Sequence, residues 1–350
     1  MGLYDLVREL PFRVEDYELD IAEKQVSPRF TRRTTTVKLR LGVSVRGAEF
    51  VGMGEDVTYD AAEHQPNHLP WAELGGDWTL ESFSQHLDGQ ELFPQGEPGQ
   101  AAARDYRRWA FESAALDLAL VQNGRSLAEV VGREPRPVRF VCSTSSSQVD
   151  DWLELYPRLR FKLDPTADWT EEFTRALADL GCVDVVDLKG HYQGTVVDNP
   201  ADPELYTRVA ELFPEAWIED AALTPETEPV LEPHRDRLTF DAPIHSWADV
   251  EALPFLPRCL NSKPSRFGTV ERLFEFYDRC AEHEIALYGG GQFELGVGRG
   301  QIQLLASLFH ADAPNDVAPA GYNAAEPVAG LPVSPIDPNP EPIGFRRAVL

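Results

Sequence analysis

The chain has 350 residues, of which 43% are hydrophobic and 26% charged, so it can bury one large core or two smaller ones. Its formal net charge of -26 argues against DNA or RNA as a partner, because phosphate binding needs a basic surface. We interpret the negative charge as a well-solvated acidic surface, and adaptation to a high-salt host is the alternative.

The sequence also argues against a membrane or secreted protein. No apolar stretch reaches the roughly 18 residues that a membrane span needs. The N-terminal segment MGLYDLVRELPFRVEDYELD lacks the basic start and apolar run of a signal peptide. The four cysteines have no CxxC pairing; they are Cys142, Cys182, Cys259 and Cys280. We expect reduced core thiols in a cytoplasmic protein.

Residues 1–135 have the pattern of an α+β domain. Extended, alternating segments come first, and helical patterns follow. The predicted strands lie at 12–23 and 34–52, and the predicted helices at 79–88 and 101–123. The segment GREPRPV at 132–138 is a predicted linker into a second unit.

From about residue 137, short apolar runs alternate with helical stretches. The apolar runs are VRFVCS, LRFKLD, VDVVDLK, AWIED, LTFDA, CLNSKPS and EIALYG, and the predicted helices between them lie at 168–180, 203–213, 247–253 and 269–283. Seven or eight such units predict a closed β/α barrel over residues 136–325. A doubly wound sheet is the alternative, but no GxGxxG follows its first strand. The proline-rich tail, 326–350, is predicted to be extended and without chemistry.

Lysine is scarce in this chain. Only five of the 32 basic residues are lysine, and the other 27 are arginine. A buried lysine can act as a proton-transfer base near neutral pH, whereas arginine cannot. Three of the five lie at the ends of predicted strands: Lys162, Lys189 and Lys263. These strand ends are therefore where we look for chemistry.

Five charged residues lie at the C-terminal ends of consecutive predicted strands. In chain order they are Lys162, Asp187, Glu219, Asp241 and Lys263, with spacings of 25, 32, 22 and 22 residues. Each spacing is close to one βα unit, and in a barrel the C-terminal strand ends converge on one mouth. The order predicts three neighbouring carboxylates with one lysine on either side.

Three carboxylates suit a hard divalent cation, so Asp187, Glu219 and Asp241 are the predicted ligands of Mg²⁺, with Mn²⁺ as the alternative. Such a cation can bind a substrate carboxylate and stabilise the enediolate formed when the α-proton leaves. It also lowers the pKa of a nearby ammonium group toward that of a working base. Lys162 and Lys263 are therefore the predicted catalytic residues, and no cofactor other than the metal is expected.

Several motifs resemble those of the enolase superfamily over roughly residues 30–325. RFKLD is similar to its KxK strand, NSKPSRFGT to its sixth-strand lysine motif, and GMGED to its Gly-x-Gly-Glu turn. RRWAFESAALDLALVQNGRSLAEVVG resembles the helix that leads into its barrel, and GGGQFELGVGRGQIQLLAS its seventh-strand loop and helix. The resemblance implies an α+β capping domain over a (β/α)7β modified TIM barrel with a Mg²⁺ site. It also implies a small carboxylate substrate and a homo-oligomer.

The two flanking lysines resemble the muconate-lactonizing subgroup, whose activities are cycloisomerisation, dehydration to o-succinylbenzoate, and racemisation or epimerisation. The mandelate-racemase subgroup would need a seventh-strand histidine, and enolase itself has a longer chain. The sequence departs from the family where Leu188-Lys189 follows Asp187, where Ala-Pro follows Asp241 and where no proline follows Asp220. Lys189 fits no family position, so a salt-bridge or rim role is expected for it.

Two other functions stay open on the sequence: a Schiff-base aldolase with Lys162 or Lys263 as nucleophile, and a metal-holding binding protein without turnover. Substrate contacts are also expected from the capping domain, near residues 24–33 and 54–62. There Arg29, Arg32 and Arg33 are candidates for an anionic substrate, with a solvated loop as the alternative for each.

Overall fold

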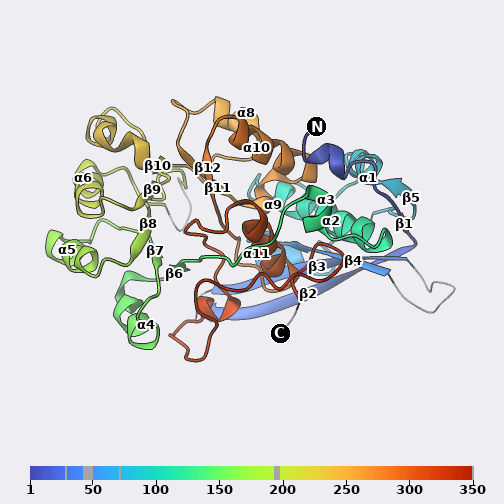
Figure 1. Ribbon diagram of the computed structural model, residues 1–350, viewed down its shortest axis with the longest axis horizontal. Coiled ribbons are helices and arrows are strands. Elements are labelled where there is room, and N and C mark those ends of the chain that lie inside the picture. Colours follow the sequence, from blue (N-terminus) through green and yellow to red (C-terminus); the bar gives the residue numbers. More distant parts are fainter. Residues whose placement is uncertain (28–29, 42–49, 71, 193–197, 349–350) are drawn as a thin grey trace.

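The computed structural model describes residues 1–27, 30–41, 50–70, 72–192 and 198–348. Figure 1 shows strands β6 to β10, with helices α4 to α6 along their outer side, at one end of the molecule. Helices α1 to α3 lie toward the opposite end, and the β2–β4 sheet lies alongside them. Among the described residues, no helix combines the length and apolar character that crossing a bilayer requires.

The described residues of the N-terminal part form two antiparallel sheets, three α-helices and two short 3-10 helices. The two-stranded sheet pairs β1 (Pro11–Val14) with β5 (Gly76–Thr79). The larger sheet has the order β2 (Asp16–Ser27), β3 (Phe30–Leu41) and β4 (Phe50–Asp56). The helices are η1 (Tyr4–Leu6), η2 (Ala61–His64), α1 (Leu80–Leu87), α2 (Ala103–Gln122) and α3 (Leu127–Val131).

Helix α2 is buried along most of its length, and glycine lets strand β4 approach it closely. A Cβ atom on Gly54 would lie 2.1 Å from the Ala110 carbonyl oxygen, and one on Gly52 would lie 2.2 Å from the Ala114 carbonyl oxygen. No side chain fits at these distances, so backbone packs directly on backbone. The GMGED segment is thus part of strand β4 and not a turn.

The C-terminal part has parallel strands that alternate with helices. The strands are β6 (Cys142–Ser143), β7 (Phe161–Leu163), β8 (Val183–Asp187), β9 (Trp217–Glu219), β10 (Leu238–Thr239), β11 (Cys259–Ser262) and β12 (Ala286–Gly289). The helices are η3 (Ser146–Gln148), α4 (Val149–Leu155), α5 (Glu171–Asp179), α6 (Pro203–Leu212), α7 (Glu228–Leu231), η4 (Glu232–Arg237), α8 (Trp247–Glu251), α9 (Pro264–Phe267), α10 (Val270–Glu282), α11 (Val297–Phe309) and η5 (Ala320–Asn323).

These strands close into a barrel. β6 to β10 pair in parallel in chain order, and β11 pairs with β12. A backbone hydrogen bond from Asn261 N to the Phe240 carbonyl joins β10 to β11. Segment 315–316 supplies the eighth position, because it pairs in parallel with Gly290 after β12 and with Phe140 before β6. The predicted α+β domain with a (β/α)7β barrel is confirmed, while the exact domain boundaries stay a prediction.

The predicted helices and strands lie close to the observed ones, with two exceptions. The predicted strand at 12–23 covers two strands, β1 and β2, which belong to different sheets. The predicted strand at 34–52 is also two strands, β3 and β4, and residues 42–49 between them lie outside the described residues. The four cysteines are all buried and unpaired, as predicted.

One hydrophobic core runs through both parts. It joins residues of α2, such as Leu118, to residues of the barrel helix α10, such as Phe274. A second core fills the barrel side that contains β6 to β9, around residues such as Trp152 and Tyr206. Because the first core crosses from the capping domain into the barrel, the two parts pack as one body.

Polar contacts fasten the capping domain to the loop and helix after β12. The buried Glu55 carboxylate accepts hydrogen bonds from the backbone N–H groups of Leu295, Gly296 and Gly298 at 2.7–3.0 Å. These donors surround the N-terminus of α11, where backbone N–H groups lack helical partners and favour negative charge. Gln301 of α11 donates to the Met53 carbonyl in return. Strand β4 therefore holds the first turn of α11.

The C-terminal tail packs onto the capping domain through Asp117 of α2. Asp117 accepts hydrogen bonds from Phe345 N at 2.7 Å and Met53 N at 2.9 Å, and it forms an ion pair with Arg346 at 2.9 Å. Burial raises the pKa of Asp117 to about 6, although Arg346 opposes the increase. The tail is thus tied to α2 by one buried carboxylate.

We predict that Asp117 makes stability depend on pH. Its folded-state pKa lies above the roughly 3.9 of an unfolded aspartate, so its contribution is fully present below pH 4 and is lost as the pH rises through 6. The stability of the native chain relative to Asp117→Asn should therefore grow by roughly 1–3 kcal/mol from pH 7 to pH 4. Denaturant unfolding of both proteins at several pH values measures this difference.

Asp179→Asn, an exposed substitution at the end of α5, controls for the general loss of one negative charge. If the free energies of unfolding of the native chain and Asp117→Asn change in parallel with pH, Asp117 does not titrate in this range.

Candidate active site

The five predicted site residues all lie at the C-terminal ends of barrel strands. Lys162 is in β7, Asp187 ends β8 and Glu219 ends β9. Asp241 follows β10, and Lys263 follows β11 directly. The structure therefore brings all five to one mouth of the barrel, where parallel strand ends meet.

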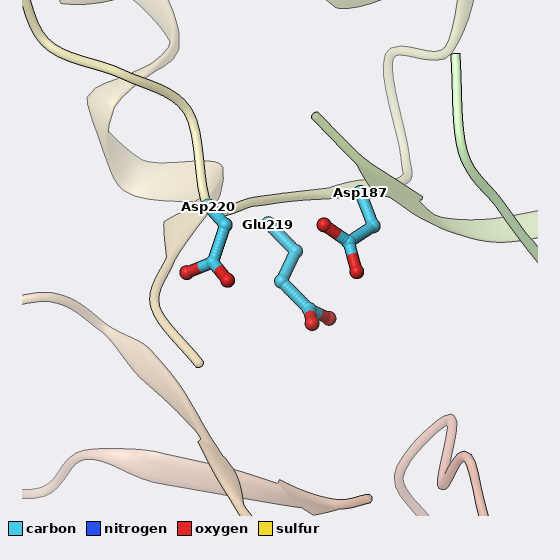
Figure 2. Close-up of side chains that lie close together, drawn as sticks. All are labelled: Asp187, Glu219 and Asp220. Carbon is cyan, nitrogen blue, oxygen red and sulfur yellow. The ribbon is translucent and has the colours of Figure 1, made fainter. Parts of the chain in front are cut away.

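Asp187, Glu219 and Asp220 form a compact group of buried carboxylates. One oxygen from each lies within 4.8 Å of the others. Figure 2 shows Glu219 between the two aspartates, with the Asp187 and Glu219 carboxylates pointing into a common space. The predicted third ligand, Asp241, is outside this group, and Asp220 takes its place there. No role is predicted for Asp220 from the sequence.

Asp220 is bound to backbone rather than to a side-chain cation. Its Oδ1 accepts hydrogen bonds from Asp241 N at 2.8 Å and Ala242 N at 3.3 Å, and its Oδ2 accepts from Ala242 N at 3.0 Å. Its φ of 51° lies in the left-handed region, which is uncommon for a residue with a side chain. Asp220 thus fixes the backbone that carries Asp241.

Lys162 lies between two of the carboxylates. Its Nζ is 2.5 Å from Glu219 Oε1 and 2.9 Å from Asp187 Oδ2. Lys189 also forms an ion pair with Asp187, and its Nζ is 3.6 Å from Asp164 Oδ1. The predicted salt-bridge role of Lys189 is confirmed.

Lys263 and Arg266 share the third carboxylate. Lys263 Nζ donates to Asp241 Oδ2 at 2.7 Å, and Arg266 Nη2 lies 3.2 Å from the same oxygen. Arg266 also donates to the Asp241 carbonyl at 2.6 Å and to the Tyr192 hydroxyl at 3.0 Å. Lys263 and Arg266 thus hold the Asp241 carboxylate through the same oxygen, Oδ2.

Polar groups on neighbouring strands complete the surroundings of Glu219. Tyr288 of β12 donates its hydroxyl to Glu219 Oε2 at 2.6 Å, and Asn261 of β11 donates to Oε1 at 3.4 Å. Together with Lys162, these contacts occupy both oxygens of the Glu219 carboxylate. Tyr288 lies on the seventh strand, where the mandelate-racemase subgroup would have a histidine.

Burial and charge act in opposite directions on the three grouped carboxylates. Burial acts to raise the pKa of Asp187, but Lys162 and Lys189 more than offset it and hold that pKa well below its ordinary value. Burial raises the pKa of Glu219 to about 8, because Lys162 offsets only part of the effect. Burial and neighbouring negative charge raise the pKa of Asp220 to about 6.

The lysines show the complementary effect. Burial acts to lower the pKa of Lys162, but Asp187 and other carboxylates outweigh it and raise that pKa well above its ordinary value. Asp241 likewise outweighs the effect of burial on Lys263 and raises its pKa. Burial acts to raise the pKa of Asp241, and Arg266 and Lys263 reverse this. Both lysines are therefore ammonium ions as they stand, and neither is yet a base.

The donor set fits a hard divalent cation. Asp187, Glu219 and Asp241 are all at most 1% exposed, and carboxylate oxygens are the ligands that Mg²⁺ prefers. Asp241 Oδ1 is buried and has no hydrogen-bond partner among the described residues. A buried acceptor without a donor is rare, and a bound water or a cation can satisfy such an atom. The structure thus supplies a cluster that can hold a divalent metal.

The predicted substrate contacts of the capping domain have different outcomes. Arg29 lies outside the described residues. Arg32 is fully buried in β3 and donates to the carbonyls of Val57, Thr58, Gln292 and Phe293, so it joins the capping domain to the loop after β12.

Arg33 forms an ion pair with Glu23. Neither Arg32 nor Arg33 belongs to a solvated loop, since both lie in strand β3. The Arg32 guanidinium is already committed to backbone carbonyls, which leaves it little capacity for an anionic substrate.

Comparison with known proteins identifies the fold. A crystal structure described as a member of the enolase superfamily from Listeria innocua matches with a TM-score of 0.61 and 17% identity, over 88% of this chain and 86% of that chain. A dipeptide epimerase from Methylococcus capsulatus, complexed with Mg and the dipeptide L-Arg-D-Lys, matches with a TM-score of 0.64 and 17% identity, over 90% and 93%.

A curated relative was found by sequence. The o-succinylbenzoate synthase of Bacillus subtilis (strain 168) is 25% identical over 261 residues, which cover 67% of this chain and 66% of that enzyme. The match therefore spans just under two thirds of the relative's length.

The fold is that of the enolase superfamily, as the sequence motifs predicted, and a muconate cycloisomerase from Pseudomonas fluorescens and the muconate lactonizing enzyme from Pseudomonas putida are among the solved structures that share it. Within that fold, the chain belongs to the family described as domain of unknown function (DUF8230). The model of its C-terminal domain matches residues 134–324, and the model of its N-terminal domain matches residues 5–130.

Proposed function

We propose that this protein is a Mg²⁺-dependent enzyme that removes the α-proton of a small carboxylate substrate through an enediolate. One observation carries the proposal: Lys162 lies in β7 and Lys263 directly follows β11, and these strands are four positions apart in an eight-position barrel, with the carboxylates between them. Two buried ammonium groups on opposite sides of a mouth can reach the two faces of one carbon atom.

Asp187, Glu219 and Asp241 would hold the metal, in agreement with the Mg²⁺ described for a relative of this fold. Bound there, the cation would supply positive charge that stabilises a substrate enediolate and lowers the pKa of the flanking ammonium groups. The unpartnered Asp241 Oδ1 favours Asp241 over Asp220 as the third ligand, since the oxygens of Asp220 already accept backbone N–H groups.

The chain's own residues would then position and transfer the proton. Lys162 and Lys263 are 2% and 7% exposed, so their Nζ atoms are shielded from bulk water. One lysine in its neutral form takes the α-proton, and the other stabilises the negative charge or returns a proton to the opposite face. Tyr288 and Asn261 keep the Glu219 carboxylate in place during this exchange.

Cycloisomerisation, dehydration and racemisation or epimerisation all begin with this step. The o-succinylbenzoate synthase relative favours dehydration, and the dipeptide epimerase relative favours epimerisation. A Schiff-base aldolase is less well supported, because both lysines form ion pairs with buried carboxylates and are poor nucleophiles in that state. A binding protein without turnover would bind metal but exchange no α-proton.

The metal assignment can be tested by titration calorimetry with Mg²⁺. We expect Asp241→Asn and Glu219→Gln to weaken Mg²⁺ binding by more than about 100-fold, because each removes a charged ligand. Asp220→Asn should weaken it by only roughly 10-fold, as expected for a residue that positions a ligand. Asp236→Asn, at an exposed ion pair with Arg258, is the matched control. If Asp220→Asn abolishes binding while Asp241→Asn retains it, Asp220 is the ligand instead.

The lysine assignment can be tested by α-proton exchange in D₂O with Mg²⁺ and a library of carboxylates. For a racemase, Lys162→Ala and Lys263→Ala should each lose racemisation but keep exchange of one enantiomer, and a different one in each case. For a dehydratase or cycloisomerase, one variant should lose exchange and the other should keep it slowly. Turnover should fall at least about 10²-fold in either variant.

Lys38→Ala, in an ion pair with Asp20 on the capping sheet, is the control for loss of a lysine. Turnover close to that of the native chain in either barrel-lysine variant, with the fold intact, would remove that lysine from the mechanism. Trapping of a carbonyl substrate by borohydride would support the aldolase.

We also propose that the protein acts in the cytoplasm as a homo-oligomer. The four buried, unpaired cysteines support the first statement, and the subgroup resemblance supports the second.

A further inference from the structure

A second feature of the barrel mouth has no role in the proton transfer. A pocket of about 720 Å³ lies between the loop after β6 and the loop after β7. It is lined by the five hydroxyl residues of segment 143–147, and by Thr166, Asp164, Asp168, Trp169 and Phe173. Its volume is in the range of small-molecule sites, and it opens at the same end of the barrel as the carboxylates.

The pocket begins next to the proposed catalytic centre. Asp164 comes two residues after Lys162 in the chain, which corresponds to about 7 Å along an extended strand. The Nζ of Lys189 links the two sites, because it contacts Asp164 on the pocket side and Asp187 on the cluster side. A molecule whose α-carbon lies beside Lys162 can therefore place a group in this pocket. That group would be separated from the α-carbon by about the length of a lysine side chain.

The charges of the residues that line the pocket favour a cationic ligand group over an anionic one. Of the described residues that line the pocket, two are carboxylates and none is lysine or arginine. Lys189 lies 3.6 Å from Asp164, whereas the one hydrogen bond that Asp168 accepts from the described residues comes from the nearby Thr166 hydroxyl. An anionic group would meet two carboxylates, of which Asp164 alone has a cation beside it, while an organic cation would be attracted by both.

The remaining lining groups suit a cation as well. The indole of Trp169 and the ring of Phe173 meet edge to face, with centroids 5.6 Å apart, and both residues line the pocket, where Phe173 is the more exposed of the two. Aromatic faces attract ammonium and guanidinium groups, and hydroxyl oxygens can accept their N–H donors.

The serine-rich loop is held in place. Thr144 donates to Gln148 at 2.9 Å, and Gln148 donates to the Ala325 carbonyl at 2.6 Å. The wall of the pocket is therefore formed before a ligand enters.

We propose that this pocket binds an organic cation, an ammonium or guanidinium group, at the end of the substrate that is remote from the reacting carboxylate. The proposal rests on the proposed function and narrows its substrate class to carboxylates with a side-chain cation about one lysine length from the α-carbon. The two pocket carboxylates disfavour a dicarboxylate substrate whose second acidic group would lie in this pocket.

The test uses three dipeptides with the Mg²⁺-loaded full chain at one fixed salt concentration. L-Ala-L-Lys carries the cation, L-Ala-L-norleucine has the same chain without it, and L-Ala-L-Glu carries the opposite charge. In titration calorimetry we expect the lysine peptide to bind roughly 10-fold more tightly than the norleucine peptide, and the glutamate peptide to bind most weakly. Asp168→Asn should reduce binding of the lysine peptide to the norleucine level and leave the norleucine peptide unchanged.

Asp168→Glu should restore part of the preference, and Glu172→Gln, an exposed carboxylate on α5 outside the lining, should change nothing. Equal binding of the lysine and norleucine peptides, or a preference that Asp168→Asn leaves unchanged, would overturn the proposal.

Exchange in D₂O separates this result from the proposed function. Charge-selective binding without α-proton exchange would keep the pocket and refute the function, whereas exchange without charge selectivity would do the reverse.

Discussion

The structure depends on a balance of buried charge at the barrel mouth. Three carboxylates at the strand ends pair with four cations: Asp187, Glu219 and Asp241 pair with Lys162, Lys189, Lys263 and Arg266. The buried carboxylate of Asp220, beside them, accepts backbone N–H groups instead. Each buried charge would be costly alone, and removal of one partner from such a pair typically costs about 3–5 kcal/mol. The same pairing keeps both lysines protonated, so the proposed chemistry requires another positive charge to bind the carboxylates. In the proposed mechanism, stability without the metal and catalysis with it would use the same residues.

The capping domain matters because it holds the barrel loops that surround this charge cluster. Glu55 binds the first turn of α11, Arg32 binds the loop after β12, and Asp117 binds the C-terminal tail. The close packing of β4 on α2, which the glycines at 52 and 54 permit, fixes the direction in which Glu55 points. Arg32, which was expected to meet substrate, is thus used in assembly, while the β6–β7 side of the mouth keeps an open, acidic pocket.

Much of this could be predicted from the sequence. The alternation of apolar runs and helices gave the barrel, and the strand-end spacing placed Lys162 and Lys263 on either side of the acids. Asp220 was missed because an acid next to Glu219 looks like a solvated loop residue, and its positive φ and backbone contacts exist only in three dimensions. Arg266 was missed although it comes one helical turn after Lys263. The fate of Arg32 could not be predicted, since its acceptors lie 25 to 261 residues away in the chain.

A crystal structure of the Mg²⁺-loaded protein would show how the metal and the two lysines are arranged. We expect a cation bound by Asp187, Glu219 and Oδ1 of Asp241, with the Nζ atoms of Lys162 and Lys263 on opposite sides of it and no longer paired with these three carboxylates. A cation bound elsewhere, or two lysines still paired with the carboxylates in the metal-loaded state, would contradict this expectation.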